Sequence, residues 1–447
     1  MKRKIYDKLL DWKNKRNGKT AVLIEGARRI GKTYTIEEFA KNEYKSYILI
    51  DFSKVSQDVI NVFENDIYDL DIFFNKIKII YNVELYKRNS LVIFDEVQLY
   101  PKARQLIKHL VADGRYDFAE TGSLISLQRN VKDILIPSEE EKLYMYPMDF
   151  EEFLWAMNWD ATYEYIKDCY EHLKPLGQSI HKVALKQFRE YMLVGGMPKV
   201  VDTYANEKNF ENVEFEKQQI LNLYLDDINK FANGERSKAK LVFNSIPSQL
   251  QKKNKKINYS ELKNNSRNSE FENTFIFLEE SMMVNLCYNV TDPAYPLILS
   301  EDISEKKCYM HDTGLLITAC LKGDQYIHSD IYKNILLDKL SINEGMFMEN
   351  IVAQAFRASN KKLFFYKKSD REKRENEMEI DFLIERQGKI CPVEVKSSVY
   401  KKHSSLDKFR LKFKKQILDS YIFYQKDVMI RDDIIHLPLY MAGLVFQ

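Results

Sequence analysis

The residues best suited to chemistry lie near the N-terminus, in one glycine-containing stretch. It reads Gly26-Ala27-Arg28-Arg29-Ile30-Gly31-Lys32-Thr33 and fits the phosphate-binding pattern G-x-x-x-x-G-K-[ST]. Glycines let a backbone wrap closely around a phosphate, and free amides at the start of a helix bind the anion. We expect Lys32 to contact the β- and γ-phosphates of a nucleotide and Thr33 to give its hydroxyl oxygen to Mg²⁺. With Tyr34, this stretch is the predicted nucleotide site.

A second group of polar residues follows the apolar run 91–94, where Asp95 and Glu96 stand together. Consecutive apolar residues are typical of a central strand in a parallel sheet, and ligands bind beyond the carboxyl ends of such strands. We expect Asp95 to hold Mg²⁺ through its water shell and Glu96 to act as general base toward the attacking water. The alternative is an ordinary strand that ends in two solvated carboxylates.

A third short strand and turn spans residues 118–123. A polar side chain at its end could sense the γ-phosphate or orient a water molecule. Ser123 is the first candidate for this role and Thr121 the second. An ordinary Ser/Gly turn is the alternative.

The C-terminal half contains a further charged group on two predicted strands, 378–384 and 390–396. The residues between them predict a turn. We take the hairpin to be symmetric about the peptide bond between Gln387 and Gly388. A shift of one residue would move the side chains of one strand to the opposite face.

With that symmetry, Asp381 lies opposite Glu394 and Glu379 lies opposite Lys396, all on one face. Facing carboxylates repel unless a cation lies between them or water screens them. Acids on a hairpin followed by Glu-x-Lys resemble the metal site of restriction-endonuclease-like nucleases. There, carboxylates hold Mg²⁺ and the lysine orients or deprotonates water. The resemblance implies Glu349 as a third acid, from a preceding helix.

Three interpretations of this hairpin stay open. It could belong to an active nuclease, or to a nuclease-like fold that serves only as a binding or assembly scaffold. It could also be an exposed hairpin with a salt bridge between Glu379 and Lys396.

The elements around the first site must form a strand, a loop and a helix. The run 21–24 is apolar, and Ile36, Phe39 and Ala40 recur with helical spacing after the loop. Together with the run 91–94, they predict an α/β core with a parallel sheet.

These segments resemble the AAA-type ATPases, in particular a prokaryotic branch with a C-terminal uncharacterised domain that resembles restriction endonucleases. The resemblance rests on residues 26–33, 95–98, 121–123, 146–153, 195–198, 311–315, 379–382 and 393–396. It implies ATP and Mg²⁺ as cofactors and covers nearly the whole chain.

Four domains are expected from the patterns and the resemblance together. They are an AAA-type P-loop ATPase core (1–150), a helical lid (151–235), a winged-helix-like segment (236–300) and a restriction-endonuclease-like α/β domain (301–447). Gly195 and Gly196 interrupt the lid, and we expect movement about them.

One departure from the related sequences concerns hydrolysis. Many relatives carry a Gly-Arg pair shortly before the segment 146–153, whereas residues 138–142 here read Ser-Glu-Glu-Glu-Lys. An arginine that reaches the γ-phosphate of a neighbouring subunit can accelerate hydrolysis by ~10³–10⁵-fold. Arg28, Arg29 and Arg129 are available, but no pattern supports any of them in this role. Nucleotide binding is therefore expected, and fast hydrolysis is less so.

Composition indicates which cellular compartment and which partners to expect. The chain has 447 residues, of which 45% are hydrophobic, and no apolar run reaches the ~18–20 residues of a membrane span. The basic start lacks a secretory apolar core, and the five cysteines form no CxxC pair. We therefore expect a cytoplasmic protein without a membrane partner.

Local charge leaves nucleic acid open as a partner, although the net charge is only +2. Basic clusters occur at residues 252–256 and between 401 and 415. Such clusters can contact a phosphate backbone, so double-stranded DNA is a candidate partner. Solvated lysine-rich helix faces are the alternative.

These patterns together predict an ATPase that binds ATP and hydrolyses it to drive or switch a conformational change, with DNA as a candidate target. One alternative is an ATP-gated, Mg²⁺-dependent nuclease. The other is a slow switch or scaffold that binds a protein partner, as a homo-oligomer or with an unidentified protein.

Overall fold

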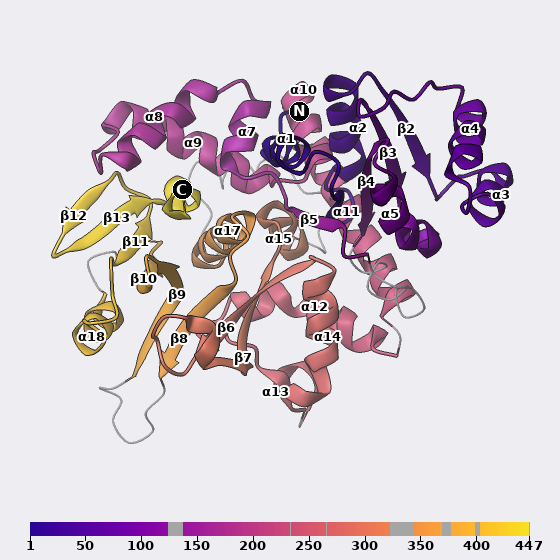
Figure 1. Ribbon diagram of the computed structural model, residues 1–447. Helices are drawn as coiled ribbons and strands as arrows, with labels where there is room; N and C mark the ends of the chain where they lie inside the picture. The colour runs from indigo at the N-terminus through magenta and orange to yellow at the C-terminus, as the bar shows by residue number, and fades with distance from the viewer. Residues whose placement is uncertain are drawn as a thin grey trace. The chain divides into compact units, whose positions relative to one another are not determined.

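The computed structural model describes residues 1–123, 137–232, 234–264, 266–321, 344–368, 377–397 and 403–446. Its contacts divide the chain into two compact units. One unit comprises Lys2–Tyr146, and the other comprises Pro147–Gln447 together with Met1. Each unit contains its own β-sheet (Figure 1).

The N-terminal unit is built on a five-stranded parallel sheet with the order β2-β3-β4-β1-β5, which confirms the predicted α/β class. Its strands are β1 (Ala21–Gly26), β2 (Ser46–Asp51), β3 (Ser90–Asp95), β4 (Asp117–Ser123) and β5 (Glu140–Met145). Its helices are α1 (Ile5–Arg16), α2 (Lys32–Glu43), α3 (Gln57–Asn65), α4 (Leu70–Tyr81), η1 (Val97–Leu99) and α5 (Pro101–Asp113).

Apolar residues bury both faces of this sheet. Every residue of β1 and of β3 is buried, as continuous apolar strands of parallel sheets are. On one face, Phe63 and Phe73 from α3 and α4 pack edge to face, and Phe63 also contacts Phe94 of β3. Strand β4 lies between β1 and β3, so three strands end side by side where the predicted nucleotide site lies.

The second unit begins with a helical region, as expected from residue 150 onward. Its helices are α7 (Phe150–Ala156), α8 (Asp160–Glu171), α9 (Gln178–Val194), α10 (Pro198–Glu207), α11 (Phe210–Phe231), α12 (Arg236–Leu250), α13 (Tyr259–Leu262) and α14 (Asn268–Glu280). A capping box between Asp149 and Glu152 fixes the start of α7.

A mixed eight-stranded sheet follows, with the order β12-β13-β11-β10-β9-β8-β6-β7. The strands are β6 (Val284–Val290), β7 (Glu301–Met310), β8 (Leu363–Lys368), β9 (Met378–Arg386), β10 (Lys389–Val395), β11 (Tyr421–Tyr424), β12 (Met429–Arg431) and β13 (Ile434–Pro438). The accompanying helices are η2 (Leu297–Ser300), α15 (Thr313–Cys320), α17 (Glu344–Ala358), α18 (Ser404–Lys412) and η4 (Leu439–Phe446).

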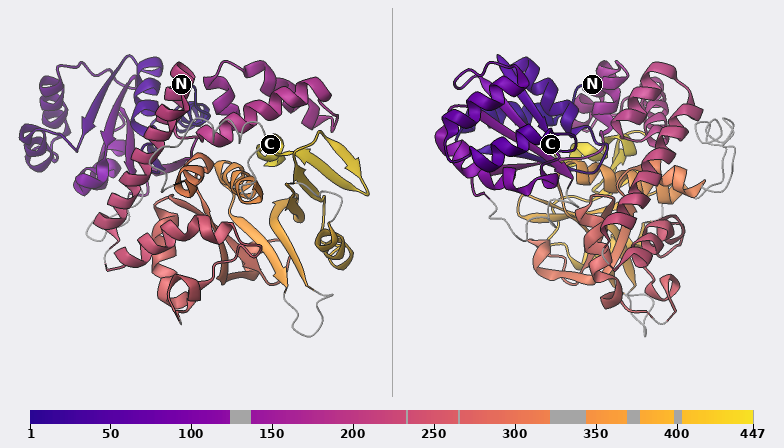
Figure 2. Two further views of the ribbon diagram at one scale, coloured as in Figure 1. Left: turned by 180° about the vertical axis from the view of Figure 1, so that it is seen from behind. Right: turned by 90° about the vertical axis from the view of Figure 1, so that its right-hand side faces the viewer.

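This sheet crosses a boundary that the sequence analysis placed near residue 300. Figure 2 shows the sheet running from β6 and β7 to the yellow strands β12 and β13. Strand β6, which we assigned to the winged-helix-like segment, pairs with β8 in the C-terminal part. The boundary near 300 therefore does not separate two sheets.

The hairpin of β9 and β10 has the register that the sequence predicts. Lys389 pairs with Arg386, and Val393 pairs with Phe382. Both turn residues have left-handed backbones, with φ of 49° at Gln387 and 73° at Gly388. A two-residue turn of this kind matches the twist of the flanking strands and so fixes their register.

The glycine pair that we expected to act as a hinge lies inside a buried polar network. Asp312 accepts hydrogen bonds from the backbone N–H of Gly196 at 2.6 Å and from that of Leu315 at 2.9 Å. A Cβ on Gly195 would lie 2.3 Å from Asp312, and one on Gly314 would lie 2.6 Å from the Val194 carbonyl. Segments 195–198 and 311–315, which are distant in sequence, therefore meet in one joint. Movement about the glycines stays a prediction.

Among the residues that the structure describes, no helix is both long enough and apolar enough to cross a membrane.

Candidate functional site

The phosphate-binding loop connects β1 to α2, where the sequence places it. Gly31 precedes α2 with φ of 89°, a conformation that favours glycine. A Cβ on Gly26 would lie 2.6 Å from the backbone oxygen of Met145, so the end of β1 also needs a glycine. The Nζ of Lys32 donates hydrogen bonds to the carbonyls of Gly26 at 2.9 Å and Ala27 at 3.0 Å. The loop thus holds its own lysine by neutral acceptors that an anionic phosphate can replace.

The remaining loop residues differ in exposure. Ile30 is fully buried, whereas Arg28, Arg29 and Tyr34 are exposed. Burial lowers the pKa of Lys32 to about 8, although the charges of Glu96 and Asp95 act in the opposite direction. An unliganded lysine of this kind loses its proton far more easily than a solvated one.

The predicted magnesium ligands lie together, with Thr33 in the first turn of α2 and Asp95 at the end of β3. The Thr33 hydroxyl donates to Asp95, with distances of 2.9 Å to Oδ1 and 3.0 Å to Oδ2. Thr121 of β4 also donates its hydroxyl to Asp95. Burial raises the pKa of Asp95, and the hydrogen bonds from Thr121 and Thr33 counteract this. Thr33 and Asp95 therefore form one polar cluster at the edge of the sheet.

Thr121 was our second choice as the sensing residue on β4. The structure places its hydroxyl on the predicted metal-binding carboxylate. The side chain of Ser123, our first choice, lies outside the described residues. The strand order explains the contact of Thr121, because β4 runs directly beside β3 and brings its inward-facing hydroxyl to Asp95.

The predicted base, Glu96, follows β3 with a left-handed φ of 52°. The side-chain amide of Gln98, which is buried, donates to Oε2 of Glu96. Sequence reasoning gave Gln98 no role, although it lies in the family-like segment 95–98. In the structure, Gln98 is the residue whose amide contacts the carboxylate of the predicted base.

The segment that lacks the expected arginine supplies a buried acid instead. Glu140 accepts two hydrogen bonds from Arg104, at 2.8 and 2.7 Å. Burial, followed by repulsion from Glu140, raises the pKa of the neighbouring Glu120 well above its usual range. The Glu140 side chain of this segment is therefore buried against Arg104, and Arg129 lies outside the described residues.

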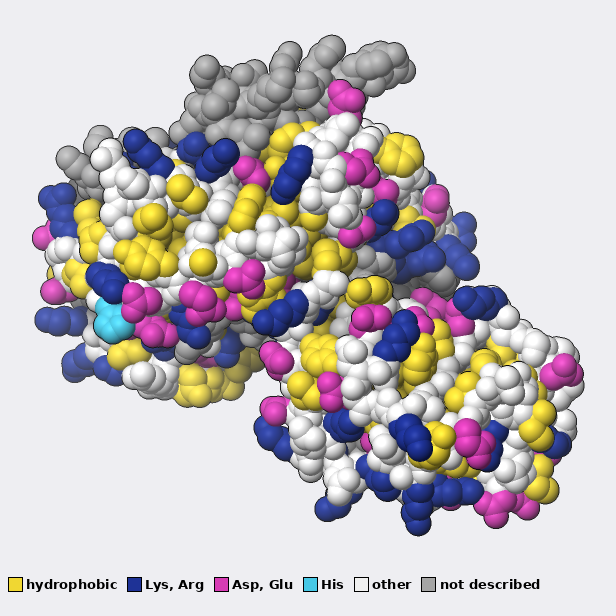
Figure 3. All heavy atoms as spheres, turned by 90° about the horizontal axis from the view of Figure 1, so that it is seen from above, with side chains coloured by type: hydrophobic (Ala, Val, Ile, Leu, Met, Phe, Trp, Pro, Cys, Tyr) yellow, Lys and Arg dark blue, Asp and Glu magenta, His cyan; other side chains and the backbone are white. Residues whose placement is uncertain are grey.

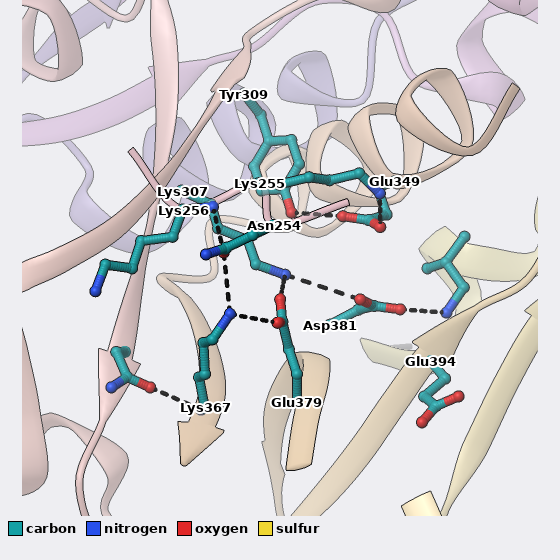
Figure 4. Close-up of polar contacts among 12 residues, drawn as sticks. Asn254, Lys255, Lys256, Lys307, Tyr309, Glu349, Lys367, Glu379, Asp381 and Glu394 are labelled. Carbon is teal, nitrogen blue, oxygen red and sulfur yellow. Dashed lines mark hydrogen bonds and ion pairs between the residues drawn. The ribbon is translucent and has the colours of Figure 1, made fainter. Parts of the chain in front are cut away.

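The four residues of the predicted C-terminal site come from one helix and one hairpin. Figure 4 labels three of them, Glu349, Asp381 and Glu394. Glu349 of α17 accepts a hydrogen bond from the Tyr309 hydroxyl at 3.0 Å and pairs with Lys255. Asp381 of β9 accepts from the backbone N–H of Val395 at 2.9 Å.

Glu394 of β10 accepts a hydrogen bond from the backbone N–H of Leu406 at 3.1 Å and pairs with Lys396. The alternative salt bridge between Glu379 and Lys396 is not formed. Glu379 pairs with Lys307 at 3.2 Å and with Lys367 at 2.8 Å instead.

Burial and neighbouring charges shift the pKa values of two of these acids in opposite directions. Burial raises the pKa of Asp381 to about 7, and Glu349 adds to this, whereas Lys307 and Lys255 oppose it. Burial alone would also raise the pKa of Glu379, but Lys307 and Lys367 bring it below its usual range. Across the described part of the chain, no three His, Cys, Asp or Glu side chains are arranged to hold a metal ion.

Three of the four lysines in the first basic cluster form ion pairs with acids of the protein itself. Lys252 pairs with Glu261, Lys255 with Glu349 and Lys256 with Glu305. In the second cluster, residues 401 and 402 lie outside the described part of the chain, and Arg410 donates to the carbonyl of Asp432 at 2.9 Å. Figure 3 shows basic and acidic side chains interspersed on the face it presents.

Three family models match separate parts of the chain. Residues 18–154 match a family model described as an AAA domain. Residues 185–326 and 344–441 match two models described as domains of unknown function, DUF8612 and DUF4143. No curated protein matches the chain.

Among solved structures, the chain is similar to a Walker-type ATPase of Pyrococcus abyssi. The two share 12% identity with a TM-score of 0.41, over 71% of this chain and 95% of that one. The AAA-domain match and the geometry around Lys32, Thr33 and Asp95 together support ATP binding and hydrolysis by the N-terminal unit.

Proposed function

We propose that this protein uses ATP binding and hydrolysis in its N-terminal unit to drive or switch a conformational change. The observation that carries the proposal is the contact between the Thr33 hydroxyl and the Asp95 carboxylate across the loop and β3. A loop lysine, a helix-starting threonine and a strand-ending acid are the groups that bind and neutralise a nucleotide triphosphate with its Mg²⁺.

Each residue has a distinct part in this proposal. Lys32 exchanges its carbonyl partners for phosphate oxygens, while Thr33 and Asp95 hold Mg²⁺, which neutralises charge on the phosphates when bound. Glu96 accepts a proton from the attacking water, and Gln98 orients its carboxylate. Thr121 fixes Asp95 from the neighbouring strand.

The test is steady-state hydrolysis of Mg·ATP by wild type and by Glu96→Gln. We expect turnover to fall by ~10²–10⁴-fold while nucleotide binding persists, because the variant loses the base and keeps the phosphate contacts. Glu64→Gln, on the exposed surface of α3, is the matched control and should behave as wild type. Equal turnover in Glu96→Gln and wild type would remove Glu96 from the mechanism.

The same assay with double-stranded DNA separates two forms of the proposal. Stimulated turnover would favour action on DNA. ATP binding without turnover in wild type would favour a slow switch that requires a protein partner. Residues 138–142, near which many relatives carry an arginine, contain none in this chain.

The second candidate function is an ATP-gated, Mg²⁺-dependent nuclease in the C-terminal half. The observation that favours it is the hairpin register, in which Phe382 pairs with Val393, one residue from Asp381 and from Glu394. A site of this kind would use Asp381, Glu394 and Glu349 to hold Mg²⁺ and Lys396 to orient water.

Cleavage of linear duplex DNA with Mg²⁺ or Mn²⁺, with and without ATP, tests this candidate. We expect Asp381→Ala and Glu394→Ala each to abolish cleavage. Glu377→Ala, at an exposed position just before β9, should retain it. Cleavage that survives both active-site changes would eliminate this site.

A further inference from the structure

An irregular basic segment, residues 251–258, connects α12 to α13 and lies along strand β7. The backbone N–H of Ile257 donates to the carbonyl of Lys306 at 2.9 Å. The backbones of Lys256 and Lys307 form an isolated antiparallel β-bridge. Asn254 accepts a hydrogen bond from Lys367 of β8 at 3.0 Å. These contacts hold the segment beside the C-terminal acidic residues (Figure 4).

Lys255 is the member of this segment whose ammonium group reaches those acids. It pairs with Oε1 of Glu349, while the Tyr309 hydroxyl binds the other oxygen, Oε2. Lys252 and Lys256 pair elsewhere, with Glu261 and Glu305. The Lys255 side chain is 15% exposed and that of Glu349 is 6% exposed, so the pair is largely removed from water.

The acidic cluster is balanced in charge among the described residues. Its carboxylates are Glu349, Glu379, Asp381 and Glu394, and the ammonium groups paired with them are Lys255, Lys307, Lys367 and Lys396. A buried carboxylate needs a counter-charge. A divalent cation can therefore enter this cluster only if a lysine leaves.

The four lysines differ in how firmly the fold holds them. Lys307 is 1% exposed in the middle of β7, and Lys367 lies on β8. Lys396 directly follows β10, and its N–H donates to the Phe423 carbonyl at 2.8 Å. Lys255 lies on an irregular segment between two helices, so it can withdraw without breaking a strand.

We propose that Lys255 is a displaceable internal counter-ion that closes a latent divalent-cation site formed by Glu349 and Asp381. This inference rests on the C-terminal acid site of the second candidate function and is independent of the ATPase. Without Lys255, Oε1 of Glu349 loses its ion-pair partner while Lys307 stays 3.8 Å from Asp381, and Mg²⁺ or Mn²⁺ can take the place of the lost ammonium group.

Direct binding of Mn²⁺ to the full-length chain, measured calorimetrically without nucleotide or DNA, tests this proposal. Every variant is made with Asp95→Asn, so that the nucleotide site lacks its predicted Mg²⁺-binding carboxylate. Lys255→Gln should bind Mn²⁺ at least roughly 10-fold more tightly than its parent, because the ion no longer competes with a charge-assisted contact. Lys255→Arg keeps the charge and should bind as the parent does.

Two further variants test whether the Mn²⁺ ion binds at Glu349 and Asp381. Lys252→Gln removes a charge from the same segment, away from the acids, and should leave the affinity unchanged. Adding Asp381→Asn to Lys255→Gln should abolish the gain. Affinity in Lys255→Gln no higher than in the parent, or a gain that survives Asp381→Asn, would overturn the proposal. Failure of DNA cleavage alone would refute the nuclease and leave this binding result intact.

Discussion

At the scale of single residues, the nucleotide site is held in place by the protein's own polar groups. Lys32 rests on two loop carbonyls, and Asp95 receives two threonine hydroxyls. Gln98 orients Glu96. In the proposed function, Lys32 exchanges these carbonyls for phosphate oxygens, whereas Thr121 keeps its contact with Asp95.

Replacement of Lys32 tests this site through both affinity and pH. Lys32→Ala should weaken Mg·ATP binding roughly 10–150-fold, since a charge-assisted contact contributes about 1.5–3 kcal/mol. Phosphate binds the protonated amine, and the unliganded pKa is about 8. Wild-type affinity should therefore fall as the pH rises through 8, by up to about tenfold per pH unit. Calorimetric titrations at pH 7, 8 and 9 measure both effects.

Lys32→Ala is also the control for the pH dependence, because it has no amine to titrate and should not show this fall. An equal pH slope in the two proteins would assign the titration to another group. Equal affinity at pH 7 would refute the role of Lys32.

At the scale of elements, the joint between α9, α10 and α15 has no space for a larger residue. A Cβ on Gly196 would lie 2.2 Å from the Met148 carbonyl oxygen and 2.8 Å from its nitrogen. The same two backbones form a hydrogen bond of 2.7 Å from Met148 N–H to the Gly196 carbonyl. The glycine therefore permits a close approach of two backbones.

Gly196→Ala should destabilise the second unit by about 1–3 kcal/mol, as overpacked sites do, because the backbone of Met148 must move. Urea unfolding followed by circular dichroism measures this. Gly443→Ala is the matched control, since a Cβ there meets nothing within 4 Å. Equal losses in the two variants would show that the contact with Met148 is not the cause.

At the scale of the whole molecule, the chain combines two compact units, each with its own sheet. The predicted nucleotide-binding residues all lie in the unit Lys2–Tyr146, and the acidic cluster lies in the other. A ligand stabilises the unit that binds it, by an amount set by its concentration relative to its dissociation constant.

Mg·ATP at 100 times its dissociation constant should stabilise the N-terminal unit by about 2.7 kcal/mol. In differential scanning calorimetry of the full chain, we expect one transition to move upward and the transition that Gly196→Ala lowers to stay in place. At the same ATP concentration, Lys32→Ala should show little shift. Movement of both transitions by ATP would show that the two units unfold as one.

The sequence by itself determined the features that depend on neighbouring residues. Strand, loop and helix around Lys32 follow from a local pattern, and the register of β9 and β10 follows from a two-residue turn with alternating side chains. Both were predictable because the interacting groups lie within a few residues of each other, where backbone geometry leaves few arrangements.

Only the tertiary structure decided which distant groups meet. Thr121 reaches Asp95 because β4 lies between β1 and β3, an order that no spacing in the sequence specifies. Lys255 neutralises Glu349 from 94 positions away. In a chain with 30% charged residues, many lysines could pair with any given acid, and the packing of the sheets selects the partner.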